Sequence, residues 1–249
     1  MALMKTSNPA LNVDSFRVEQ AVSGEPMTLT GTINKTGVLL ICVVATAAWG
    51  WNRFFNAPAS DTALPLVATG GIGGLIVATV TVFKKEWSPI TAPIYALLEG
   101  LALGGISAAF ELRYPGIAVK AVGLTFGTLF VLLMAYRSGL IRVTEKFKLG
   151  VVAATGGIAV FYLVQFVLGF FGVRFAAING SGLLGIGFSV VVVSVAALNL
   201  VLDFDFIESG VNAGAPKYME WYGAFGLIVT LVWLYLEILR LLAKLNSRK

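Results

Sequence analysis

The sequence predicts an all-α integral membrane protein with seven transmembrane helices. Hydrophobic residues make up 57% of the 249 residues and charged residues only 12%, against about 25% in an average soluble domain. Seven apolar stretches are each long enough to cross a bilayer, which takes about 20 residues. These stretches and their short connections use almost the whole chain, so we expect no separate soluble domain.

The chain is expected to begin with a polar tail at residues 1–34, followed by one seven-helix domain at residues 35–249. The tail mixes acids with bases and contains many Ser, Asn, Thr, Gly and Pro residues, so we expect it to be mobile. No early apolar stretch follows a basic start, which argues against a cleaved signal peptide.

Each span is predicted from an apolar run bounded by turn residues such as Asn179-Gly180-Ser181-Gly182. The seven expected spans are Gly37–Phe55, Pro65–Phe83, Ile90–Phe110, Ile117–Tyr136, Leu149–Phe171, Leu183–Asp203 and Trp221–Leu245. The alternative to seven full spans is six spans and a re-entrant seventh stretch, which would put both termini on the same side of the membrane.

Small residues recur at the spacing that lets two helices approach closely in lipid. Gly70 and Gly74, Gly100 and Gly104, and Gly123 and Gly127 each form a GxxxG pair. We interpret all three pairs as packing faces inside the molecule rather than as a dimer interface.

The distribution of Lys and Arg predicts the orientation, because cytoplasmic loops carry an excess of these residues. Ten basic residues lie on the side of the N-terminal tail: Lys5, Arg17, Lys35, Lys84, Lys85, Arg137, Arg142, Lys146, Lys148 and Lys217. The loops of the other side hold Arg53, Arg113, Lys120 and Arg174, although four more bases lie near the C-terminus. We therefore expect a cytoplasmic N-terminus.

The residue inventory excludes several classes of function. The chain has no histidine and a single cysteine, Cys42, so it has no Ser-His-Asp triad, no histidine-ligated metal and no internal disulfide. No protease or esterase motif and no phosphate-binding loop is present. We expect neither an enzyme nor a cofactor, and we attribute the basic residues to anionic lipid rather than to nucleic acid.

The acids within or at the ends of the spans are the candidate functional residues, because charge inside a bilayer is costly. Glu99 lies near the middle of the third span, where its partner must be another helix, water or a proton. Asp203 is expected to close the sixth span, with Asp205 and Glu208 following it. A carboxylate at that end opposes the helix dipole, so we expect Lys84 and Lys85 as counter-ions.

Glu237 in the seventh span precedes Arg240 by three residues, which allows an ion pair within the helix. Thr230 lies seven residues before Glu237, almost on the same face. The structural alternatives are a protonated, hydrogen-bonded Glu99, a Glu237–Arg240 pair without further role, and solvated Asp205 and Glu208.

Several short segments together resemble the Bax inhibitor-1 (transmembrane BAX inhibitor motif) family, specifically its bacterial YccA-like branch. They are Ala92–Gly104, Tyr114–Ile117, Ala196–Asp205, Trp221–Leu227 and Trp233–Leu242. The resemblance covers roughly residues 35–245. It implies a bundle in which the last helix lies at the centre of two three-helix layers, and a location in the bacterial inner membrane.

The resemblance also implies a function and a site. Members of the family are described as pH-sensitive calcium leak channels and as modulators of cell death or membrane proteolysis, with a pair of aspartates as pH sensor. Asp203 matches the first aspartate and Thr230 occupies the position of the second, so this chain departs from the pattern there. Glu237 and Glu99 are the substitutes that the sequence offers.

Two functions are therefore expected as alternatives. In the first, the protein is a passive pathway for a cation, calcium being the expected ion, gated by carboxylate protonation. Asp203 would be the main sensor and a transient calcium ligand, with Glu237, Glu99 and Asp205 in support. In the second, the protein conducts nothing and binds another membrane complex, such as a membrane protease, through residues 1–34.

Overall fold

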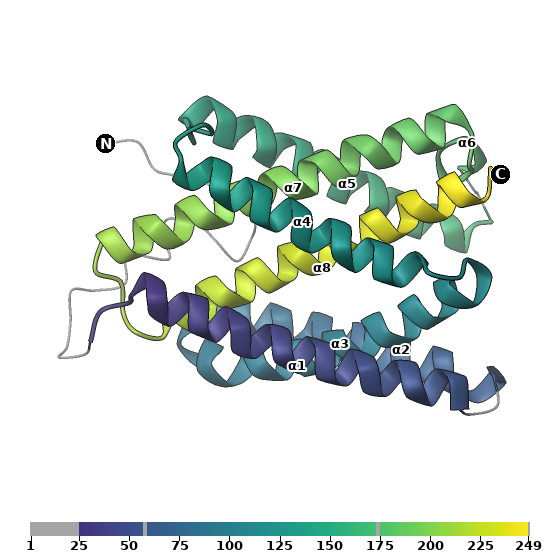
Figure 1. The fold of residues 1–249 in the computed structure, drawn as a ribbon, viewed down its shortest axis with the longest axis horizontal. Coiled ribbons are helices and arrows are strands. Elements are labelled where there is room, and N and C mark those ends of the chain that lie inside the picture. Colours follow the sequence, from purple (N-terminus) through teal and green to yellow (C-terminus); the bar gives the residue numbers. More distant parts are fainter. Residues whose placement is uncertain (1–24, 57–58, 173–174, 249) are drawn as a thin grey trace.

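The structure is a computed structural model that describes residues 25–56, 59–172 and 175–248. These residues form eight α-helices and one short 3-10 helix, η2 (Figure 1). In chain order they are α1 (Leu29–Asn56), α2 (Ala59–Phe83), η2 (Lys85–Trp87), α3 (Ser88–Arg113), α4 (Ile117–Arg137), α5 (Glu145–Phe170), α6 (Ala176–Asn179), α7 (Leu183–Asn212) and α8 (Met219–Asn246).

The last helix, α8, lies at the centre of the bundle. It runs between a layer of α1, α2 and α3 and a layer of α4, α5 and α7 (Figure 1), and it packs against α1, α3, α4 and α7. Several of its large side chains, including Tyr222, Phe225, Leu234 and Leu239, are fully buried. The expected all-α bundle with a central last helix is confirmed.

Seven of the helices in the described residues are long and apolar enough to cross a membrane, and α8 is continuous over 28 residues. Large apolar side chains cover the outside of the bundle, among them Ile41, Leu75, Val119 and Phe166. Such a surface would drive a soluble protein to associate, whereas it suits contact with lipid tails. The chain is a multi-pass integral membrane protein, as expected.

Two of the three GxxxG pairs bring helices together. A Cβ atom on Gly104 would lie 2.4 Å from the backbone oxygen of Ala47 on α1, and one on Gly70 would lie 2.5 Å from backbone atoms of α3. The prediction is wrong for Gly123 and Gly127 on α4. Neither position has a neighbouring atom within 4 Å of the added Cβ, because this face of α4 points away from the other described helices.

Two helices extend by eight residues or more beyond the predicted spans. Helix α1 begins at Leu29 rather than Gly37, so residues 29–34 of the expected tail are helical, whereas residues 1–24 lie outside the described part. Helix α7 continues to Asn212. Asp203 therefore lies inside a helix, and its expected place at a helix end is wrong. Phe206 and Ile207 stabilise the additional turns of α7, because both belong to the buried core.

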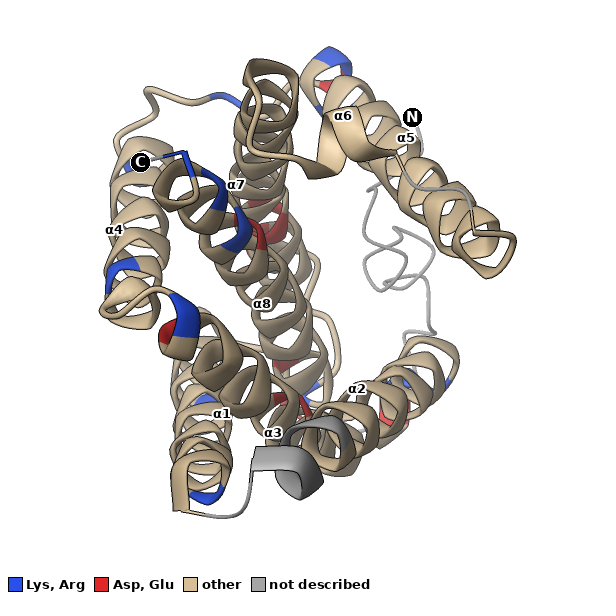
Figure 2. Cartoon of the chain, turned by 90° about the vertical axis from the view of Figure 1, so that its right-hand side faces the viewer, with Lys and Arg blue, Asp and Glu red and all other residues tan. Residues whose placement is uncertain are grey.

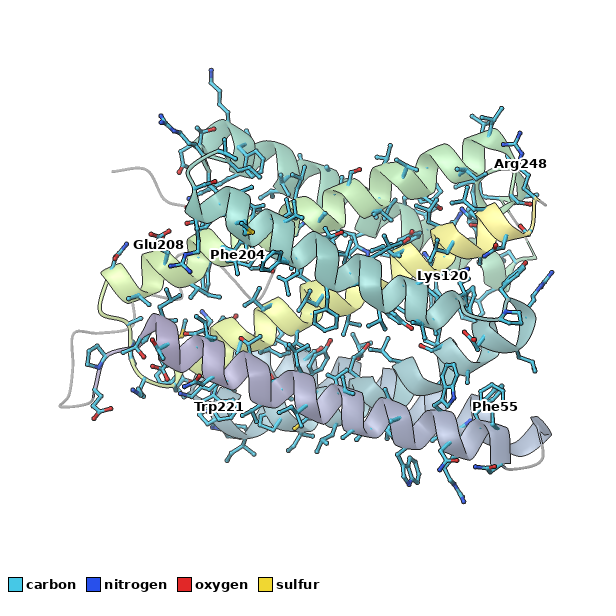
Figure 3. All side chains as sticks on the ribbon, viewed as in Figure 1. Phe55, Lys120, Phe204, Glu208, Trp221 and Arg248 are labelled. Carbon is cyan, nitrogen blue, oxygen red and sulfur yellow. The ribbon has the colours of Figure 1, made fainter. Side chains whose placement is uncertain are left out.

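The helix directions define two faces of the bundle. The N-terminal face carries the starts of α1, α3, α5 and α8. The C-terminal face carries the end of α8 and the starts of α2, α4 and α7. Glu208 and Trp221 lie toward the N-terminal face, and Phe55 and Arg248 lie toward the C-terminal face (Figure 3).

Candidate functional site

Asp203 is the most deeply buried of the predicted site residues. It lies two and a half turns before the end of α7, and only 1% of its surface is exposed. One turn later on the same face, the Ile207 side chain packs against Gly223 of α8. Asp203 is thus enclosed by the bundle rather than exposed at its end.

The three acids of this segment lie in three different environments. Asp203 is buried among the helices, whereas Asp205 forms an ion pair of 2.8 Å with Lys148 of α5. Glu208 is exposed and accepts a hydrogen bond from the Tyr136 hydroxyl of α4. From the sequence these acids are expected to form one negative helix end, but successive positions of a helix point about 100° apart, so each acid faces a different environment.

Glu237 is held by a second polar group that joins α5 to α8. Its Oε1 atom accepts hydrogen bonds from Arg240 Nη1 at 2.9 Å and from the Tyr162 hydroxyl at 3.0 Å. Arg240 also donates to the Tyr162 oxygen. The predicted ion pair within the helix is confirmed. Oε2 of Glu237 is buried and has no hydrogen-bond partner among the described residues.

The contacts between α7 and α8 show which residues lie at the same depth. These helices are antiparallel, with Ile207 against Gly223 and Ser189 bonded to Lys244. With a rise of 1.5 Å per residue, Asp203 lies at the depth of residues 227–228, roughly 3–4 Å from Thr230 and about 14–15 Å from Glu237 along the axis. Buried Thr230 is thus near Asp203 in depth, and Glu237 is not.

Glu99 belongs to another part of the bundle. Its Oε2 atom lies 2.9 Å from where a Cβ atom on Gly74 would be, so the carboxyl group packs against α2. Of the two lysines expected as counter-ions, Lys84 is exposed. The Lys85 ammonium lies 5.7 Å from the centre of the Tyr222 ring. The structure therefore does not gather the predicted acids into one cluster.

Helix α5 carries a polar stripe that the sequence analysis missed. Lys148, Thr155 and Tyr162 are spaced seven residues apart and therefore share one face. Lys148 binds Asp205, Thr155 accepts a 2.7 Å hydrogen bond from Asn199 of α7, and Tyr162 binds Glu237. The seven-residue spacing of polar residues in an otherwise apolar span is the signal that could have revealed this stripe.

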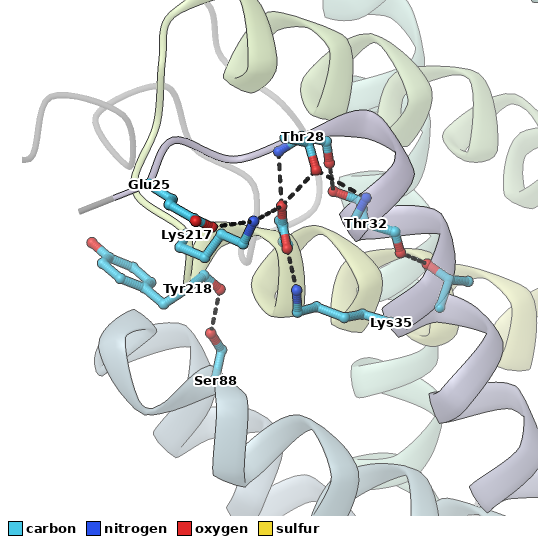
Figure 4. Close-up of polar contacts among 10 residues, drawn as sticks. Glu25, Thr28, Thr32, Lys35, Ser88, Lys217 and Tyr218 are labelled. Atoms are coloured by element: carbon cyan, nitrogen blue, oxygen red, sulfur yellow. Dashed lines mark hydrogen bonds and ion pairs between the residues drawn. The ribbon is translucent and has the colours of Figure 1, made fainter.

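A second missed residue is Glu220, in the first turn of α8. Its side chain is fully buried and forms ion pairs with Lys35 of α1 and with Lys217. Its Oε1 atom accepts hydrogen bonds from the backbone N–H and the hydroxyl of Thr28, at 2.8 and 2.9 Å. Figure 4 shows the residues around it. A carboxylate at this position also complements the positive end of the helix dipole.

The residues just before α1 are bound to the same region. Met27 is buried, and its N–H donates to the Ala215 oxygen at 2.7 Å. Glu25 forms a 3.2 Å ion pair with Lys217, and its carboxylate raises the pKa of that lysine above the usual value. Residues 25–28 thus connect the start of α1 to the loop between α7 and α8.

A third missed residue is Lys244, near the end of α8. It is buried, and its ammonium group donates to the backbone oxygens of Ile178 and Gly185 and to Ser189 Oγ, at 2.8–2.9 Å. Since an ammonium group has three N–H donors, all of them are used. Lys244 therefore joins the C-terminal end of α8 to α6 and to the start of α7.

Two cavities lie elsewhere in the bundle. One, of about 500 Å³, is apolar and is lined by residues of α1, α3, α4 and α8. The other, of about 620 Å³, lies at the C-terminal face. No Asp or Glu lines either of them. Within the described part of the chain, no group of three or more Cys, Asp or Glu side chains could hold a metal ion.

Comparison with known proteins agrees with this architecture. A family model described as Bax inhibitor 1 like matches residues 8–247, which is nearly the whole chain. No curated protein and no solved structure gives a significant match. The family match covers all seven membrane-spanning helices, including α7 with Asp203 and the central α8. The chain belongs to the Bax inhibitor 1 like family.

Proposed function

We propose that this protein is a passive leak pathway for a cation, with calcium as the expected ion, and that protonation of Asp203 gates it. The observation that carries the proposal is the burial of Asp203, of which 1% is exposed, within a helix that continues for more than two turns on either side. A carboxylate at such a depth must be neutralised by a base, a proton or a metal cation.

Competition between a proton and a cation for Asp203 would make the flux depend on pH. A carboxylate oxygen is a ligand that calcium prefers, and protonation removes the negative charge that attracts the ion. Thr230, at nearly the same depth on α8, offers a hydroxyl oxygen. It takes the place of a second carboxylate, so one acid rather than a coupled pair titrates at this level.

The other predicted acids have supporting roles. Asp205 and Glu237 are each held by a base, Lys148 and Arg240 respectively. Glu237 also keeps one buried oxygen, Oε2, for a proton or an ion. Because the Asp203 side chain is buried in the described arrangement, an ion can reach it only if α7 moves relative to its neighbours.

We assign the N-terminal face to the cytoplasm. In the described residues this face carries Lys35, Lys84, Lys85, Arg137, Arg142, Lys146, Lys148 and Lys217. Such an excess of basic residues is typical of the cytoplasmic side. The resemblance to the bacterial branch supports a location in the inner membrane.

The test is calcium entry into liposomes that contain the purified protein, measured at acidic and at neutral pH. We expect the wild type to show a protein-dependent flux that differs between the two pH values. Because asparagine cannot titrate, Asp203→Asn should bring the ratio of the two fluxes to about one. Glu208→Gln is the matched control, since this exposed acid lies on the same helix; it should retain the wild-type ratio.

Two outcomes would contradict the proposal. If Asp203→Asn, eluting as a folded protein in gel filtration, keeps the wild-type pH profile, Asp203 is not the sensor. If the wild type gives no flux above that of empty liposomes at either pH, the protein is not a leak pathway. The alternative function, binding to another membrane complex, would then be favoured.

A further inference from the structure

The cavity at the C-terminal face is lined by basic residues from two different helices. It has a volume of about 620 Å³ and lies between the end of α3, the last turns of α8 and the segment that joins α6 to α7. Arg113, Arg240 and Lys244 line it together with Asn179 and Ser181. Figure 2 looks onto this end of the bundle and shows basic residues on the last turns of α8.

The charge around this cavity is positive. Three cations line it and no Asp or Glu does, while the nearby carboxylate of Glu237 neutralises part of the charge of Arg240. The last carbonyl groups of α8 would repel an anion, but two of them are already engaged. The N–H of Ser247 donates to Ala243, and its hydroxyl donates to Lys244.

Some hydrogen-bond donors of these cations bind protein oxygens, and others remain for a ligand in the cavity. Lys244 uses its three donors on protein oxygens, so it contributes charge only. Arg240 donates to Tyr162 and Glu237 through Nη1 alone, and a guanidinium group has three further N–H donors on Nη2 and Nε. Arg113 is exposed, with its guanidinium carbon 5.6 Å from the Tyr114 ring centre.

The position of the cavity suits a ligand of the membrane surface. Arg113 is the last residue of α3, and Arg240 and Lys244 lie in the last two turns of α8, so the cavity lies where the spans leave the hydrocarbon. Phe110 and Ala243 add an apolar wall. Basic pockets between transmembrane helices bind anionic lipid head groups, and arginine suits phosphate because its planar fork offers two parallel donors.

We propose that this cavity is a binding site for a phosphate group. Arg113 and Arg240 would donate directly to the phosphate oxygens, Asn179 and Ser181 would add neutral donors, and Lys244 would supply charge. The phosphate can belong to an anionic phospholipid head group or be free in solution. This site is separate from Asp203 and does not depend on the proposed leak.

The experiment compares the thermal stability of the purified protein in detergent with three additions: phosphatidylglycerol, phosphatidylcholine and inorganic phosphate. We expect phosphatidylglycerol to raise the midpoint of unfolding, because a ligand that binds only the folded state stabilises it. Arg113→Gln should weaken that binding by about tenfold or more, since it removes a charge-assisted hydrogen bond. Arg113 is the residue of choice because it is exposed and no ion pair of the described structure depends on it.

Arg53→Gln is the matched control, because Arg53 lies in the last turn of α1, on the same face of the bundle, but does not line the cavity. It should bind as the wild type does. Stabilisation by inorganic phosphate alone would identify a free phosphate as the ligand, and stabilisation by phosphatidylglycerol alone would identify a lipid. Three outcomes would overturn the proposal. Phosphatidylglycerol and phosphatidylcholine could raise the unfolding midpoint equally, or no addition could raise it. Arg53→Gln and Arg113→Gln could also weaken the binding of phosphatidylglycerol equally.

Discussion

Replacing Glu220 with alanine is expected to lower the free energy of unfolding by about 3 kcal/mol, because hydrogen bonds to a charged group contribute about 1.5–3 kcal/mol each. The change removes the ion pairs with Lys35 and Lys217 and both hydrogen bonds from Thr28. We choose the lower end of the range for such losses, since Glu220 lies near a membrane face. Denaturation of the purified protein in mixed micelles measures the effect.

Glu86 provides the control for this prediction. It is an exposed acid on η2, at the same face of the bundle, and Glu86→Ala should change the stability by no more than about 0.5 kcal/mol. If both substitutions have the same small effect, the contacts of Glu220 do not hold α1 to α8. Glu220→Gln should lie between them, because an amide oxygen can still accept hydrogen bonds from Thr28.

Replacing Gly104 with leucine is expected to destabilise the protein by about 3 kcal/mol or more, which is the upper range for inserting extra atoms into a packed core. Even the first added atom would lie 2.4 Å from the backbone oxygen of Ala47. A backbone atom cannot rotate away as a side chain can, so α1 and α3 must separate. The same mixed-micelle denaturation measures the loss.

Gly127 is the matched control for Gly104, since it also ends a GxxxG pair within a span. No atom lies within 4 Å of a Cβ atom added there, so Gly127→Leu should leave the stability nearly unchanged or raise it through the better helix propensity of leucine. A large loss for Gly127→Leu would mean that another molecule packs on that face of α4. A small loss for Gly104→Leu would contradict the close approach of α1 and α3.

Most of the fold could be predicted because hydropathy depends on each segment's own residues. The ends of α2 and α4 lie within one residue of the expected ends of their spans, Phe83 and Tyr136. The start of α1 and the end of α7 could not be predicted, since contacts distant in sequence stabilise them. Thr28 meets Glu220, which is 192 residues away, and Asp205 meets Lys148 on another helix.

The candidate site was less predictable for the same reason. The Glu237–Arg240 pair follows from spacing within one helix, and it is present. Glu220 stands among Lys217, Tyr218 and Trp221, a composition typical of a solvated membrane interface, and nothing local shows that it is buried. Gly123 and Gly127 were likewise predicted to form a packing face from their spacing alone. Spacing does not tell which face of a helix meets a neighbour.

The polar stripe on α5 has a consequence for how this helix could leave the bundle. Its bridges from Lys148, Thr155 and Tyr162 are spaced about 10 Å apart along the axis, and its other faces expose apolar residues such as Leu163 and Phe166. Breaking one bridge alone would place unpaired polar groups beside lipid while the neighbouring bridges still hold the helix. The three bridges therefore favour all-or-none detachment of α5 over gradual tilting, and any movement of this helix would be a cooperative transition between two states.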